Sequence, residues 1–139
     1  MLDTVRFLKA QDEYYEKALA EIKSGRKRSH WIWFIFPQLT ALGRSETARY
    51  YGIDSLADAR AYLECEVLRS RLYEITKVLL TSLEKNPILL MGGYVDAVKL
   101  RSSMTLFSKA DPDNPLFREV LDTFFEGKED PYTLKILSL

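Results

Sequence analysis

Apolar side chains recur at helical spacing near the start of the chain. From Asp3 or Thr4, either of which can cap a helix, they recur every three or four residues to about Lys23, and Gly25 follows as a stop. The pattern predicts a long helix whose inner face carries Val5, Leu8, Tyr15, Ala18, Leu19 and Ile22. We expect its charged positions, Glu21 among them, to form a solvated face.

The same period returns along the rest of the chain. We expect a short helix capped by Ser45, one capped by Asp54 or Ser55, longer helices over about residues 67–83, 94–109 and 113–126, and a last turn or two after Asp130-Pro131. The segment from Trp31 to Phe36 has no period, so a buried strand and a short buried helix both remain open. Together these patterns predict a mainly α, compact, multi-helix fold, with residues 1–139 forming one domain.

Composition narrows the classes of function. The 139 residues fit one domain, and because 20 basic residues balance 20 acidic ones, no overall charge favours nucleic acid or a membrane as partner. One cysteine, Cys65, excludes an internal disulfide, and one histidine leaves no zinc-site spacing. We expect no metal, no cofactor, no membrane-spanning segment and a cytoplasmic location.

The basic turn, residues 25–30, contains three cations, a serine and the single histidine. It is followed directly by an aromatic block, the aromatic and aliphatic residues from Trp31 to Phe36. If Ser29 caps a helix that begins at His30 or Trp31, free backbone N–H groups would face the side chains of Arg26, Lys27 and Arg28 and form an anion site. Trp31 and Trp33 could then stack on a ligand ring. The alternative is solvated cations and tryptophans packed in the core.

A second group of polar residues lies in the predicted helix 94–109. Asp96, Lys99 and Ser103 fall within about 60° of one another on a helical wheel. This stripe either faces a ligand or is satisfied internally by an Asp96–Lys99 pair, with Ser102, Ser103 and Thr105 bonding back to helix carbonyls. The segment Gly43-Arg44-Ser45 is a lesser candidate, because it precedes another helix N-terminus.

Two residues are candidates for catalysis. His30 titrates near neutrality, and its cationic neighbours favour the neutral form that suits a general base. Lys99 could stabilise developing negative charge, and activation of Ser103 by Lys99 is a weaker alternative.

The basic turn with its aromatic block, Gly25 to Gln38, and the segment Asp96 to Phe107 closely resemble bacterial domain-of-unknown-function family 1810, whose members are often mislabelled calpastatin. The resemblance covers almost the whole chain. It implies a small, mainly helical, single-domain cytoplasmic protein with no assigned activity. The positions that match the family's polar and aromatic motifs are Lys27, Ser29, His30, Trp31, Trp33, Gln38, Ser45, Asp96, Lys99, Ser102, Ser103 and Thr105.

These observations lead to one functional hypothesis and one alternative. We expect the basic turn and the polar stripe to converge on a pocket for a small anionic ligand, a nucleotide or other phosphorylated metabolite, with or without catalysis. The ligand-binding candidates are Arg26, Lys27, Arg28, Ser29, Trp31, Trp33, Gln38, Ser45, Asp96, Ser102, Ser103 and Thr105. The alternative is a non-enzymatic module that docks a protein or a single nucleic-acid strand on the basic turn and its tryptophans.

Overall fold

Side-chain caps mark the starts of five helices. Each cap accepts a hydrogen bond from a backbone N–H in the first turn, and the five are Asp3, Ser45, Ser55, Asn86 and Asp130. The computed structural model describes residues 1–139. In chain order the elements are α1 (Thr4–Lys23), α2 (Ile32–Ile35), the 3₁₀ helix η1 (Thr40–Leu42), α3 (Glu46–Tyr50), α4 (Leu56–Glu64), α5 (Glu66–Thr81), α6 (Pro87–Leu90), α7 (Tyr94–Ala110), α8 (Leu116–Phe125) and α9 (Pro131–Leu137).

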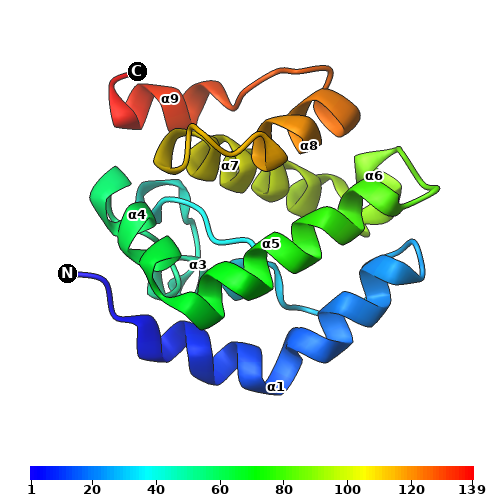
Figure 1. The fold of residues 1–139 in the computed structure, drawn as a ribbon, viewed down its shortest axis with the longest axis horizontal. Helices are drawn as coiled ribbons and strands as arrows, with labels where there is room; N and C mark the ends of the chain where they lie inside the picture. Colours follow the sequence, from blue (N-terminus) through cyan, green and yellow to red (C-terminus); the bar gives the residue numbers. More distant parts are fainter.

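The helices surround α7. It packs against α2, α4, α6, α8 and α9, whereas α1 packs mainly against α5 and α2. In Figure 1, α1 crosses the bottom of the view, α5 runs diagonally across the middle and α7 lies above α5, with α8 and α9 at the top. The predicted mainly α, single-domain fold is confirmed, and no helix combines the length and apolarity needed to cross a membrane.

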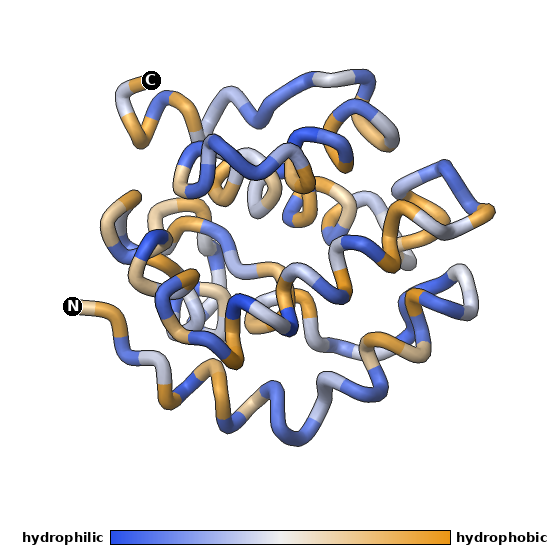
Figure 2. The backbone as a smooth tube through the Cα atoms, in the orientation of Figure 1, coloured by the Kyte–Doolittle hydropathy of each residue, from blue (hydrophilic) through white to orange (hydrophobic).

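A row of aromatic rings connects the layers. Phe7 of α1 meets Tyr62 of α4 edge to face at 5.2 Å between ring centroids, and Phe107 of α7 lies 5.3 Å beyond Tyr62. Phe117 of α8 follows at 5.7 Å. All four side chains are fully buried, so they join four helices in one hydrophobic core. Figure 2 shows the complementary pattern, in which the connection from α8 to α9 is hydrophilic.

Two expectations about α1 are wrong. Val5 is 56% exposed, and Phe7 and Gln11 point inward in its place. Gln11 is tolerated in the core because its Nε2 donates to the Phe34 carbonyl oxygen and to the Tyr62 hydroxyl, at 2.8 and 2.9 Å. Glu21, expected on the solvated face, is also buried.

The structure also decides between the two alternatives for residues 31–36 and shifts the start of the helix expected from residue 113. Residues 31–36 contain a single buried helical turn, α2, so the helical alternative holds. The helix expected from residue 113 begins at Leu116 instead, because residues 111–114 form a turn and the Asn114 side chain accepts a hydrogen bond from the backbone N–H of Leu116.

The loop between α2 and α3 is pinned to the chain after α3. Leu39 and Ile53 form an isolated parallel bridge, with hydrogen bonds of 2.9 Å from Thr40 N to the Ile53 carbonyl and from Ile53 N to the Gln38 carbonyl. This pinning fixes the position of Gln38 and of the segment that leads to Ser45.

Candidate functional site

The basic turn is organised around the carboxylate of Glu21, near the end of α1. Its Oε1 accepts hydrogen bonds from the backbone N–H groups of Arg28 and Ser29 and from the indole of Trp31, at 2.7, 2.9 and 3.0 Å. Its Oε2 accepts from the Ser29 hydroxyl at 2.6 Å. The protein therefore supplies its own anion to the N–H groups that were expected to bind a ligand.

Glu21 is held ionised by these donors. Burial alone would raise the pKa of this carboxyl, but the hydrogen bonds from the Ser29 hydroxyl, from the two backbone N–H groups and from the Trp31 indole outweigh it and lower the pKa to about 2 from 4.5. Ser29 does not cap a helix, because α2 begins at Ile32, Trp31 is the residue before it, and no side chain caps its first turn. Sequence reasoning missed Glu21, and only its place on the helix that ends at the turn could have indicated it.

Lys27 joins the basic turn to the polar stripe of α7. Its Nζ lies 2.7 Å from Asp96 Oδ2, donates to the Ser29 carbonyl oxygen and sits 4.8 Å from the centroid of the Trp31 ring. The Lys27 side chain is 4% exposed and that of Asp96 23%. The two predicted stretches thus meet through a largely buried ion pair, and Asp96 pairs with Lys27 instead of Lys99.

The remaining residues of the basic turn do not converge with this pair. Arg26, Arg28 and His30 are exposed, and none of their side chains makes a hydrogen bond or ion pair. Trp31 is fully buried and offers no surface for stacking. His30 therefore has no oriented partner that would make it a general base.

Trp33, unlike Trp31, lies beside a cation of the polar stripe, Lys99. Its ring centroid is 5.4 Å from Lys99 Nζ, and its Nε1 is enclosed without a hydrogen-bond partner. Lys99 makes no ion pair and no hydrogen bond to Ser103, whose fully buried hydroxyl also lacks a partner. Nothing in this arrangement activates Ser103 as a nucleophile.

The other hydroxyls of the stripe are satisfied. Thr105 Oγ1 donates to the Arg101 carbonyl oxygen and accepts from the backbone N–H of Asp130, both at 2.9 Å. Ser102 Oγ lies 3.1 Å from both the Val98 carbonyl oxygen and Asp130 Oδ2, and its single proton serves one of them at a time. Ser102 and Thr105 thus connect α7 to Asp130, the N-cap residue of α9.

A cavity of about 880 Å³ opens where three parts of the chain meet: the segment from Gln38 to Ala48, the first half of α7, and α9. Its lining residues are Gln38, Ala41, Leu42, Arg44, Ser45, Ala48, Tyr94, Val95, Val98, Lys99, Ser102, Asp130, Tyr132, Lys135 and Ile136. Four of the predicted site residues, Gln38, Ser45, Lys99 and Ser102, are among them. The others in the predicted set lie outside this lining.

The cavity is cationic. Arg44, Lys99 and Lys135 line it, and none of them has a carboxylate within ion-pair distance. Asp130 is the one acidic side chain in the lining. The cavity therefore has an excess of positive charge in a protein whose formal net charge is zero.

Sequence reasoning missed four lining residues that can carry recognition, namely Tyr94, Asp130, Tyr132 and Lys135. Both tyrosines are more than half exposed, at 61% and 69%. Exposed tyrosine has no signature in a hydropathy pattern, and the Asp130-Pro131 signal indicated only a helix start.

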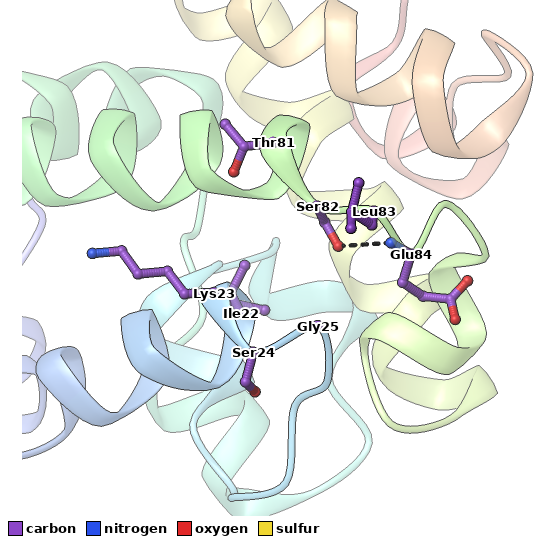
Figure 3. Close-up of a pocket in the computed structure, with 8 residues that line it drawn as sticks. All are labelled: Ile22, Lys23, Ser24, Gly25, Thr81, Ser82, Leu83 and Glu84. Atoms are coloured by element: carbon purple, nitrogen blue, oxygen red, sulfur yellow. Dashed lines mark hydrogen bonds between the residues drawn. The ribbon is translucent and has the colours of Figure 1, made fainter.

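A second hollow of about 530 Å³ lies between the C-terminal ends of α1 and α5 (Figure 3). Helix C-termini present carbonyl oxygens and the negative end of the dipole, which disfavours an anion. Its charged residues, Lys23 and Glu84, balance, and the Ser82 hydroxyl already accepts the Glu84 backbone N–H at 3.1 Å. No group of histidine, cysteine and acidic side chains is arranged to hold a metal ion.

The fold and the site define an all-helical, single-domain protein with a cationic, tyrosine-lined cavity. The chain belongs to the family of proteins of unknown function DUF1810, which it matches over residues 1–137, so the resemblance seen in the sequence is confirmed. It is also similar to the conserved hypothetical protein Rv1873 from Mycobacterium tuberculosis, whose crystal structure agrees with a TM-score of 0.94 at 41% identity over 99% of this chain and 97% of that one. No curated protein matches the chain.

Proposed function

We propose that this protein binds a small anionic ligand, a nucleotide or other phosphorylated metabolite, in the cavity between η1, α7 and α9. The observation that carries the proposal is the set of three cations, Arg44, Lys99 and Lys135, that line one cavity without an ion-pair partner. A bound phosphate would provide the missing counter-charge through charge-assisted hydrogen bonds.

The other lining groups fit such a ligand. A volume of about 880 Å³ lies in the range of small-molecule sites. Tyr94 and Tyr132 offer exposed ring surface on which a nucleobase could stack. Cys65 is free of any disulfide, which agrees with the reducing cytoplasm that we propose as the compartment.

The proposal concerns binding and not catalysis. His30, the candidate base, does not line the cavity, whereas Lys99 does. The alternative function, docking of a protein or a nucleic-acid strand on the basic turn and its tryptophans, has less support because Trp31 is fully buried and Trp33 is partly buried.

The test compares two pairs of single-charge variants. Arg44→Ala and Lys135→Ala remove exposed cations of the cavity, and Arg26→Ala and Arg28→Ala remove exposed cations of the basic turn. Each variant and the wild type are titrated by calorimetry with nucleoside monophosphates, dinucleotides, sugar phosphates and dicarboxylates.

A charge-assisted hydrogen bond contributes about 1.5–3 kcal/mol, so each cavity variant should bind the best ligand about tenfold to a hundredfold more weakly. The basic-turn variants should retain wild-type affinity. Loss of binding in Arg26→Ala and Arg28→Ala alone would reject the cavity and favour the basic turn.

A further inference from the structure

We infer that Asp130 recognises a hydroxyl group of the bound ligand, so that the ligand class is a ribonucleotide in preference to a simple phosphate. The inference rests on the proposed function, because it assumes that a phosphorylated ligand occupies the cavity. It adds a second, opposite kind of contact to the cationic one.

Asp130 is buried and held in one orientation. It is 4% exposed, and its Oδ2 accepts hydrogen bonds from the Thr133 backbone N–H at 3.0 Å and the Thr133 hydroxyl at 2.6 Å. Ser102 Oγ lies 3.1 Å from the same oxygen. The Asp130 backbone N–H is also occupied, since it donates to Thr105. The carboxylate is therefore held in one orientation through Oδ2, in the lining of the cavity.

The other oxygen, Oδ1, accepts no hydrogen bond from the protein, and it is not among the enclosed polar atoms that lack a partner. Asp130 itself lines the cavity. Oδ1 is therefore not fully enclosed, and we take it to be the acceptor that Asp130 presents to the cavity. No lysine or arginine lies within ion-pair distance of Asp130, although three cations line the same space.

A cavity with these two features selects a ligand with two matching parts. A phosphate carries mainly acceptors, which suit Arg44, Lys99 and Lys135, and its negative charge would be repelled by the Asp130 carboxylate. A sugar hydroxyl supplies the donor, and a base supplies a ring for the tyrosines. The ribose, phosphate and base of a 5′-ribonucleotide combine all three.

The first test uses the wild-type protein. The four ribonucleoside 5′-monophosphates and their 2′,3′-dideoxy counterparts are titrated in parallel by calorimetry. Removal of the sugar hydroxyls leaves Oδ1 without a donor, so the dideoxy ligand should bind about tenfold to a hundredfold more weakly than its ribo counterpart.

The second test replaces the acceptor at the Asp130 Oδ1 position by a hydrogen-bond donor. In Asp130→Asn the amide oxygen has to take the Oδ2 position, because the Thr133 backbone N–H donates there and cannot accept, so the amide NH₂ replaces Oδ1. The variant keeps the helix cap but presents a donor to the cavity. We expect its preference for the ribo over the dideoxy ligand to disappear, while its affinity for the dideoxy ligand stays the same or rises.

The outcomes separate the two proposals. Equal affinities of the wild type for ribo and dideoxy ligands would overturn the role of Asp130, as would an Asp130→Asn variant that weakens both ligands equally, since that is the behaviour of a merely structural cap. If no nucleotide binds but a different phosphorylated compound does, and loses affinity in Arg44→Ala, the ribonucleotide class is rejected and the anion site stands. The wild-type comparison remains decisive if Asp130→Asn fails to fold.

Discussion

Glu21 orders the basic turn at the level of a single residue. Its carboxylate accepts hydrogen bonds from two backbone N–H groups, a hydroxyl and an indole, which would otherwise need water as a partner. These bonds fix the turn that follows α1. The backbone N–H groups that were expected to bind an anion in the basic turn thus already bind one, the Glu21 carboxylate.

The low pKa of Glu21 predicts acid sensitivity. A carboxyl whose pKa falls from 4.5 to about 2 on folding contributes about 3 kcal/mol of stability above pH 4.5, and this contribution is lost as the pH falls toward 2. Glu21→Gln should lower the free energy of unfolding at pH 7 by about that amount, and the variant should lose less stability than the wild type between pH 4.5 and 2. Urea unfolding at several pH values measures both.

The matched control is Glu16→Gln on the same helix. Glu16 is exposed and makes no hydrogen bond or ion pair, so its replacement should change stability by no more than about 0.5 kcal/mol. Parallel acid curves for Glu21→Gln and the wild type would contradict the assignment of the acid-labile stability to Glu21.

The pair of Lys27 and Asp96 predicts strong coupling. Removal of either charge alone leaves the other largely buried without its counter-ion, so Lys27→Met and Asp96→Asn should each destabilise the protein by about 2–3 kcal/mol. The double variant should lose clearly less than the sum, with a coupling energy of at least about 1 kcal/mol. Chemical denaturation of the four proteins closes this cycle, and additive losses would mean that the two side chains act independently.

At the level of elements, the junction between α6 and α7 supports the basic turn. The Lys27 backbone N–H donates to the Leu90 carbonyl oxygen at 2.7 Å, and a Cβ on Gly92 would lie only 2.5 Å from the Lys27 carbonyl oxygen. Gly92 also has a φ of +76°, which L side chains rarely adopt. A residue without a side chain is required here for both reasons.

Gly92→Ala should therefore destabilise the protein more than the same substitution at a glycine that has a similar φ but open space around its Cα. Gly25 provides this comparison, because its φ is +90° and a Cβ there would meet nothing within 4 Å. We expect Gly25→Ala to cost about 1 kcal/mol from backbone strain alone and Gly92→Ala at least about 1 kcal/mol more. Equal losses in thermal unfolding would show that the close approach to Lys27 is easily relieved.

Most elements of this fold follow from short-range signals, because caps and periodicity act within a few residues. Ser45, Ser55 and Asp130 each cap the helix expected of them. The failures have tertiary causes. Near the start of α1 the buried positions are Phe7 and Gln11 instead of Val5. Gln11 finds its partners on α2 and α4, and no local pattern can indicate such partners.

The cavity is a property of the whole molecule, and this explains why the sequence only partly predicts it. Its lining comes from three segments that are distant in the sequence: Gln38 to Ala48, the first half of α7, and Asp130 to Ile136. The bridge at Leu39 and the packing of α9 on α7 bring them together. Lys99 and Ser102 were identifiable as polar positions on an apolar helix. Lys135 and Tyr132 resemble ordinary surface residues until the fold places them in the same cavity lining as Arg44.

The charge distribution of the whole molecule predicts how ligand binding depends on salt. Since the formal net charge is zero, attraction of a phosphate should come from the local excess of cations in the cavity and not from a long-range field. Screening shortens from about 8 Å at 0.15 M salt to about 3 Å at 1 M, so affinity should fall with ionic strength over this range. The fall should be shallower in Lys135→Ala, which has one fewer cavity cation, and unchanged in Arg28→Ala, and calorimetric titrations of the three proteins at several salt concentrations measure these slopes. A slope that responds to Arg28→Ala but not to Lys135→Ala would move the anion site from the cavity to the basic turn.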